Sequence, residues 1–113
     1  MSEPIQIVAT GDVLRKVAPH LKIIHPSPEG NECFELIDKV EILWHHDFPA
    51  GSLSGITEVH FRAGGQDYRS TTRLGYDGHS FVAVNGSGPA GRVFITPRQL
   101  TKLWMYGPPK YLP

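Results

Sequence analysis

The segment spanning residues 56–85 constrains the fold of this chain more than any other part of its sequence. Apolar and polar residues alternate along it, as they do in a half-buried strand. Two dipeptides, Gly64-Gly65 and Asp77-Gly78, interrupt the alternation with residues that tolerate the positive φ of a tight two-residue loop. The segment therefore predicts a three-stranded antiparallel meander.

A two-residue loop at Gly64-Gly65 also determines how the first two strands pair. The facing pairs are then expected to be Ala63/Gln66, Arg62/Asp67, Phe61/Tyr68, His60/Arg69, Val59/Ser70 and Glu58/Thr71. One face of the meander is predicted to be apolar and to carry Val59, Phe61, Tyr68 and Leu74. The other face is predicted to carry Glu58, His60, Arg62, Asp67, Arg69, Thr71 and Arg73, with an ion pair between Arg62 and Asp67. We call this second set the charged face.

With 113 residues, of which 40% are apolar and 19% charged, the chain has the size and composition of one globular domain. We therefore predict a single domain over residues 1–113. The formal net charge of zero argues against a dedicated polyphosphate binder. However, residues 1–56 are formally −4 and residues 57–113 are formally +4. Either the two halves neutralise each other by packing, or the meander presents a basic surface to an anionic partner.

Cys33 is the only cysteine, so the chain cannot form an internal disulfide, and its apolar sequence neighbours predict a small core residue. No apolar run approaches the roughly 20 residues that cross a bilayer. The N-terminus also lacks a basic segment followed by an apolar one. These features predict a cytoplasmic protein without membrane contact.

The best-delimited helix is predicted over residues 97–106. Thr96 and Gln99 have the spacing of a capping box, and Pro97 suits the first helical position. The buried stripe of this helix is expected to be Leu100, Leu103 and Trp104. Shorter patterns predict a brief helix at residues 13–18 and strands at residues 5–9, 21–24 and 92–95.

Residues 32–46 fit two templates. On a helix, most of the apolar residues share one face, with two exceptions. On strands, apolar and polar residues alternate, again with two mismatches, Ile37 and Leu43. We favour the helix because it needs no break at Asp38-Lys39.

Together these elements predict an α+β fold. We expect an antiparallel sheet of about five strands, built on the meander at residues 56–85. Two or three short helices are expected to cover its apolar face, including the C-terminal helix at residues 97–106. Neither an internal repeat nor a linker long enough to separate domains interrupts this pattern.

Two further motifs resemble ligand sites without meeting their requirements. Residues 86–91 match the G-x-G-x-x-G pattern of dinucleotide sites, but a strand-like sequence follows where that mechanism needs a helix N-terminus, so we predict a hairpin loop. The six histidines are His20, His25, His45, His46, His60 and His79. None forms the i,i+4 helical pair or i,i+2 strand pair typical of zinc sites. We expect no metal and no other cofactor, although a site assembled across the fold stays open.

The charged face supports two functional hypotheses. In the first, the chain is a small accessory or inhibitor protein that docks on a protein or a protein–nucleic acid complex, because clustered guanidinium groups can bridge carboxylates or phosphates. Its binding residues are expected to be Arg62, Arg69, Arg73 and His60. Direct recognition of nucleic acid fits less well, since no aromatic side chain is expected on this face.

In the second hypothesis, the chain is a metal-independent ribonuclease or phosphoesterase. His60 would move a proton beside Arg69 and Thr71, which lie on the neighbouring strand. We prefer the docking hypothesis because the sequence places no second general acid within reach of His60.

Overall fold

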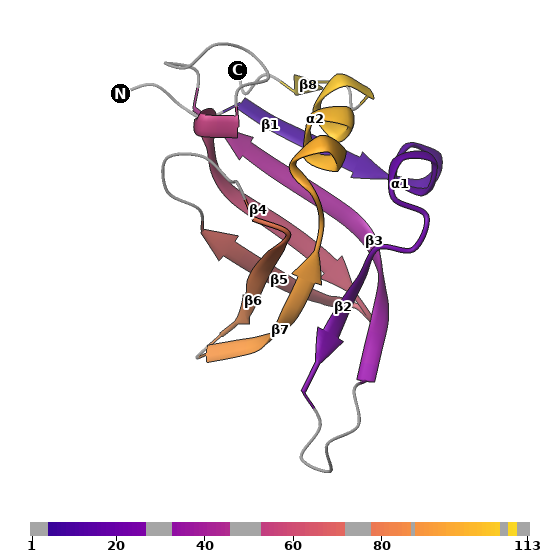
Figure 1. Cartoon of the computed structure of the whole chain (residues 1–113), viewed down its shortest axis with the longest axis vertical. Coiled ribbons are helices and arrows are strands. Elements are labelled where there is room, and N and C mark those ends of the chain that lie inside the picture. Colours follow the sequence, from indigo (N-terminus) through magenta and orange to yellow (C-terminus); the bar gives the residue numbers. More distant parts are fainter. Residues whose placement is uncertain are drawn as a thin grey trace.

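The computed structural model describes residues 5–26, 33–45, 53–71, 78–86, 88–106 and 109–110. Its elements, in chain order, are β1 (Ile5–Thr10), α1 (Gly11–Val17), β2 (Lys22–His25), β3 (Cys33–Trp44), the 3₁₀ turn η1 (Leu53–Gly55), β4 (Ile56–Ala63), β5 (Gln66–Thr71), β6 (Ser80–Asn85), β7 (Gly88–Phe94), α2 (Pro97–Tyr106) and β8 (Pro109–Lys110). Figure 1 shows the strands wrapped around a common interior, with both helices toward one end.

Six strands close into an antiparallel barrel. Their order is β2-β7-β6-β5-β4-β3, and β3 pairs again with β2. β1 and β8 extend the sheet from the part of β3 that β2 does not occupy. The chain is thus a mostly β single domain, which corrects the predicted α+β fold with a helix-covered sheet of about five strands. The sheet covers its apolar face with its own opposite wall, so a layer of helices is not needed.

Residues 32–46 contain one long strand, β3, so the favoured helix is wrong. The break that the strand template required is a β-bulge between Ile37 and Lys39, with Asp38 as the extra residue. Before the bulge position 37 is buried, and after it positions 40, 42 and 44 are buried. The bulge lies where β3 changes its partner from β2 to β1. Cys33, predicted to be a core residue, is exposed at the start of this strand.

The first hairpin of the predicted meander is confirmed. β4 and β5 pair in the expected register at all six positions, from Ala63/Gln66 to Glu58/Thr71. Its apolar face lines the barrel interior, where the buried side chains include Val59, Phe61 and Tyr68. The Gly64-Gly65 loop takes positive φ at both residues, as a tight hairpin requires.

The second hairpin differs from the prediction. A two-residue loop at Asp77-Gly78 would place Arg69 opposite Gly86, whereas Arg69 faces Val84. The predicted register is therefore wrong by two residues, a shift that leaves the same side chains on each face. Two residues of this prediction, Leu74 and Asp77, lie outside the described residues.

The start of α2 is as predicted. The Thr96 hydroxyl accepts a hydrogen bond from the backbone N–H of Gln99 over 3.2 Å, and Gln99 Oε1 accepts one from the backbone N–H of Thr96 over 3.0 Å. The buried stripe includes Leu100 and Leu103. Trp104 packs on Trp44 with ring centroids 5.0 Å apart. α2 therefore covers the end of the barrel beside β1.

The barrel interior is filled by apolar side chains. The largest fully buried side chains are Phe61, Ile23, Ile42, Val40, Val59 and Val93 on the barrel strands, and Ile7, Ile95, Leu100 and Leu103 on β1, directly after β7 and on α2. Each stabilises the fold by roughly 1.5–3 kcal/mol relative to an exposed side chain. Because side chains occupy the interior, a site for a ligand or partner is to be sought on the outer walls or at the barrel ends.

Candidate functional site

The structure places the described part of the charged face on the outside of β4 and β5. His60 faces Arg69, and Arg62 faces Asp67, as predicted. Between Arg62 Nε and Asp67 Oδ1 the distance is 4.0 Å, and both side chains are exposed, so this ion pair contributes little to stability. Two predicted side chains lie outside the described part of the chain, those of Arg73 and Thr71.

β3 adds charged residues to this surface that the favoured helix would have placed elsewhere. Lys39 Nζ lies 2.6 Å from Glu41 Oε1, and Gln6 Nε2 donates to Glu41 Oε2 over 2.7 Å. Burial alone favours the neutral carboxyl of Glu41. The hydrogen bond and charge of Lys39, the hydrogen bond of Gln6 and the charge of His60 outweigh burial and lower the pKa of Glu41. Glu41 is therefore held as a carboxylate.

His60 lies beside a carboxylate on its own strand. Its Nε2 is 2.9 Å from Glu58 Oε1, but the geometry between them is not that of an aligned hydrogen bond. Acid–base cleavage of a phosphoester needs a second proton donor. In the described part of this surface Lys39 and Glu41 are paired with each other. The arrangement thus provides a single imidazole opposite Arg69.

Most charges of this surface are compensated within it. The ion pairs are Lys39–Glu41 and Arg62–Asp67, Glu58 lies beside His60, and the depression of about 240 Å³ among these residues is lined by both signs of charge. Arg69 is the exception, since no carboxylate of the described residues pairs with it. A surface whose charges are already paired offers little net attraction to an anionic partner.

The outer side formed by β2, β7, β6 and the start of β3 carries an exposed apolar surface. Five large apolar side chains are exposed in the described part of the chain, and four of them lie here: Phe34, Leu36, Val82 and Phe94. The fifth is Met105 on α2. We call these four residues, together with half-buried Ile24, the apolar wall. Soluble proteins rarely gather exposed apolar side chains in this way without a functional reason.

Strand register brings the apolar wall together. Ile24 on β2 pairs with Phe34 on β3 and with Arg92 on β7. Arg92 in turn pairs with Val82 on β6. These four paired residues form one row across four strands, and the row is apolar except for the guanidinium of Arg92. The next row contains Leu36, which pairs with Lys22, and Phe94, which pairs with Ser80.

The bulge in β3 explains why the apolar wall includes part of that strand. Regular alternation from buried Val40 would also turn Asp38, Leu36 and Phe34 toward the interior. The extra residue reverses the alternation, so that Ile37 is buried while Leu36 and Phe34 are exposed. The same irregularity that shapes the strand therefore exposes Phe34 and Leu36.

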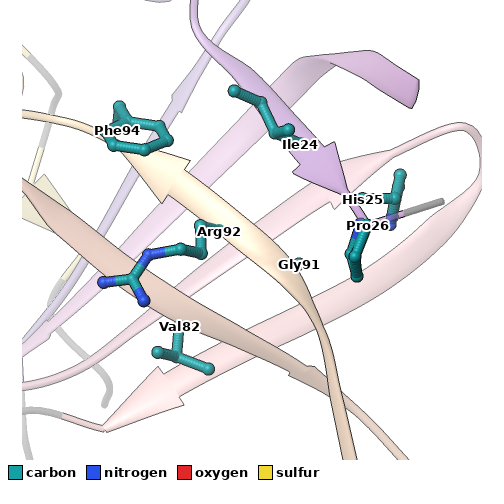
Figure 2. A pocket seen from close by; sticks show the side chains of 7 residues that line it. All are labelled: Ile24, His25, Pro26, Val82, Gly91, Arg92 and Phe94. Carbon is teal, nitrogen blue, oxygen red and sulfur yellow. The ribbon is translucent and has the colours of Figure 1, made fainter. Parts of the chain in front are cut away.

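A groove of about 570 Å³ follows the apolar wall between β2 and β7. Its lining residues are Ile24, His25, Pro26, Val82, Gly91, Arg92 and Phe94. Figure 2 shows Phe94 and Ile24 toward one end of the groove and Pro26 toward the other. A Cβ at Gly91 would lie 2.5 Å from the carbonyl oxygen of Ile24, so the close approach of the two strands requires glycine there.

Two cations lie at the apolar wall, Arg92 in the groove lining and Lys22 against Phe34. Arg92 Nη2 donates to Ser80 Oγ over 2.9 Å, and Lys22 Nζ lies 4.3 Å from the ring centroid of Phe34. Neither is paired with a carboxylate among the described residues. Lys22 lies two residues before Ile24, which pairs with Arg92 on the adjacent strand. The Cα atoms of residues in such a diagonal relation are about 7–8 Å apart. Within the described part of the chain, the two positive charges beside the apolar wall thus have no carboxylate partner.

His25 joins the groove to the end of the barrel. Its Nδ1 carries the hydrogen, because the group 2.8 Å away is the carbonyl oxygen of Ala90. Its Nε2 lies 3.7 Å from Glu35 Oε1, and its ring is tilted on Tyr68 with centroids 5.8 Å apart. Burial, then the charge of Glu35, raise the pKa of Tyr68 against the opposing hydrogen bond of Asn85. The hydrogen bond of His25 joins β2 to β7. The raised pKa keeps the phenol of Tyr68 neutral.

The two ligand motifs of the sequence have structural roles in the described chain. Gly86 takes a φ of 64° in the turn between β6 and β7, and β7 begins at Gly88. The glycine-rich segment is thus a hairpin, as predicted, although its second strand starts before the expected residue 92. Among the described residues, no three His, Cys, Asp or Glu side chains lie close enough to hold a metal ion. His46, which follows His45 in the sequence, lies outside those residues.

No family model matches this chain, and no curated protein or solved structure is significantly similar to it. Neither helix in the described part of the chain has the length and apolar character needed to cross a membrane. The function is therefore argued from the geometry of the two outer surfaces.

Proposed function

We propose that this chain is a small binding protein that docks on a protein partner through the apolar wall. One observation carries the proposal: four of the five exposed large apolar side chains that are described lie on adjoining strands, and two of them, Val82 and Phe94, line one groove. Exposed apolar surfaces of this kind mark docking sites on soluble proteins. An accessory or inhibitory role suits a small domain that offers such a surface.

Covering the apolar wall supplies free energy for docking. A Phe or Leu side chain gains roughly 1.5–3 kcal/mol when it is moved fully out of water. Phe34, Leu36 and Phe94 are each more than half exposed, so a partner that covers all three gains roughly 2–5 kcal/mol from them. The polar edge of the groove, formed by Ser80 and Arg92, then orients the partner.

The charged face is the second candidate, and Arg69 is the observation that favours it. Its guanidinium lacks a carboxylate partner among the described residues, so it can meet an anionic group of a partner. Docking through Arg62, Arg69, Arg73 and His60, or phosphoester cleavage by His60 with Arg69 and Thr71, would use this surface. The internal pairing of its other charges makes the apolar wall the better supported site.

Affinity capture from the native host, with matched variants, separates the two surfaces. The wall variant is Leu36→Thr/Phe94→Thr, which keeps β propensity while removing two exposed apolar side chains. Met105→Gln removes the fifth described exposed large apolar side chain, which lies on α2, and serves as the control for the wall variant. An Arg62→Ala/Arg69→Ala/Arg73→Ala variant tests the charged face. Circular dichroism and a thermal melt establish that each variant is folded.

The proposal predicts a partner that the wild type, the Met105→Gln control and the arginine variant retain but the wall variant loses. The captured protein is then purified and its direct 1:1 binding measured. If the arginine variant loses the partner and the wall variant retains it, docking uses the charged face and the proposal is wrong.

A further inference from the structure

We infer that the partner segment in the groove is an acidic, amphipathic stretch of protein, with carboxylates beside the apolar side chains that cover the wall. This inference rests on the proposed docking function and names the chemistry of the partner. Its basis is that the apolar wall and its rim contain two cations, Lys22 and Arg92, and no carboxylate partner for them among the described residues.

Both cations are available to a partner. Arg92 is exposed, and its one described polar contact is the neutral hydroxyl of Ser80, so its remaining N–H groups can donate hydrogen bonds to a carboxylate. Lys22 lies against the ring of Phe34, where a partner that covers Phe34 also reaches the ammonium group. A charge pair that is desolvated at an interface contributes more than one on an open surface. Apolar and charged contacts would therefore form together.

A second copy of this chain is a poorer occupant of the groove. In an isologous dimer the same surface faces itself, so Lys22 and Arg92 of one copy would face the same cations of the other. Like charges brought together at an interface disfavour association. Since no carboxylate of the described wall neutralises them, self-association through this surface is opposed by the charges that favour an acidic partner.

A single-stranded nucleic acid also fits less well. Stacking on Phe34 and Phe94 is sterically open, because both rings are exposed. However, the remaining members of the apolar wall are aliphatic and offer no π-face to a base, and two cations neutralise few phosphates. The whole chain has no net positive charge either. The wall therefore matches the mixed apolar and acidic surface of a protein segment.

The groove has the size for such a segment. Its volume of about 570 Å³ falls within the roughly 300–1,000 Å³ of pockets that bury most of a small ligand. It is bounded by β2 on one side and by β6 and β7 on the other, as Figure 2 shows. A short stretch of chain can thus place apolar side chains in the groove while its carboxylates reach Lys22 and Arg92.

A displayed random peptide library, panned against the immobilised full chain, provides the test. Bound phage are eluted and sequenced after parallel selections on the wild type, the Leu36→Thr/Phe94→Thr variant and the Met105→Gln control. The inference predicts wild-type peptides that combine Asp or Glu with aromatic or aliphatic residues. The wall variant should fail to select them, and the control should select them as the wild type does.

Charge reversal gives a second, quantitative measurement. The selected peptide is synthesised, and its binding to Lys22→Glu/Arg92→Glu is expected to weaken about tenfold or more. A peptide with its carboxylates replaced by Lys should restore that binding. The matched control is Arg62→Glu, which reverses an exposed charge on β4, a strand that supplies no residue to the groove and pairs only with β3 and β5, and it should change the affinity less than about twofold.

The outcomes separate this inference from the docking function on which it rests. Wall-dependent peptides without an excess of Asp or Glu would overturn the acidic partner and leave docking standing. Failure to select any peptide that depends on Leu36 and Phe94 would count against both. Wall-dependent dimers in sedimentation velocity, or wall-dependent binding of a labelled single-stranded oligonucleotide, would assign the groove to a second copy or to a nucleic acid.

Discussion

The Nδ1–H of His25 donates to the carbonyl oxygen of Ala90 over 2.8 Å, and this side chain joins β2 to β7 next to the two residue pairs that form their ladder. β2 has four residues, and both of its edges are paired. Closure of the barrel therefore depends on the short ladder between β2 and β7, which we call the seam. The docking groove lies on the outside of that seam, so contacts that keep the seam closed also shape the groove.

Replacement of His25 tests the contribution of this contact. His25→Ala removes the donor and leaves a carbonyl group without its partner, which should lower the free energy of unfolding by about 1–2 kcal/mol in urea denaturation. His25→Asn offers an N–H at a similar position and should lose less. Equal stability of His25→Ala and the wild type would show that the hydrogen bond does not hold the seam.

Gly91→Ala tests the close approach of the same two strands. The added Cβ would lie 2.5 Å from the carbonyl oxygen of Ile24, so the backbone of β2 or β7 has to shift. Strain of this kind typically costs about 1–3 kcal/mol, and a lower urea midpoint with an unchanged m-value is expected. A midpoint equal to that of the wild type would contradict the tight seam.

The apolar wall is predicted to contribute little to folding. Leu36→Thr and Phe94→Thr alter exposed side chains, so each should change the free energy of unfolding by less than about 0.5 kcal/mol. Phe61→Ala, at a buried position of the same barrel, should cost about 3–5 kcal/mol. Thermal and urea denaturation of the three variants check this contrast. A large loss of stability in either threonine variant would mean that the wall is part of the core.

Glu41 should make stability depend on pH in the acidic range. Its pKa is lower in the folded chain than the ordinary value of 4.5, so the unfolded chain takes up the proton first as the pH falls. The stabilisation is present above pH 4.5 and is lost as the pH drops through the lowered pKa. Urea denaturation from pH 7 to pH 3 should therefore show a smaller loss of stability for Glu41→Gln than for the wild type. Parallel curves would contradict this role of Glu41.

Local sequence rules predicted the parts of the fold that depend on local contacts. Gly64-Gly65 determined the register of β4 and β5, because a two-residue loop admits one pairing. The capping residues of α2 determined where that helix begins. Both features can be assessed within a few residues of chain, and both are confirmed.

The remainder of the fold depends on residues far apart in the sequence. Closure of the barrel requires β2 to pair with β3 on one edge and with β7, about 70 residues later, on the other. The residue pattern of β2 alone does not indicate that this strand pairs on both edges. The α+β prediction failed at this point because an open sheet and a closed barrel have the same alternation along each strand.

The part of the apolar wall that lies on β3 was missed because of the bulge in that strand. Adjacent apolar residues at Leu36 and Ile37 were the available signal, since neighbours on a regular strand point to opposite faces. Their presence required either a helix or an exposed apolar position, and the helix was favoured. The charged surface was predicted more completely, because the hairpin register places His60, Arg62 and Arg69 together.

The most direct test of the central claim is the dissociation constant of the captured partner, measured by isothermal titration calorimetry. Removing the two exposed side chains in Leu36→Thr/Phe94→Thr should raise it at least about thirtyfold, equivalent to about 2 kcal/mol of lost apolar burial. Met105→Gln should bind as the wild type does. Equal dissociation constants for the wild type and the wall variant would contradict docking through the apolar wall.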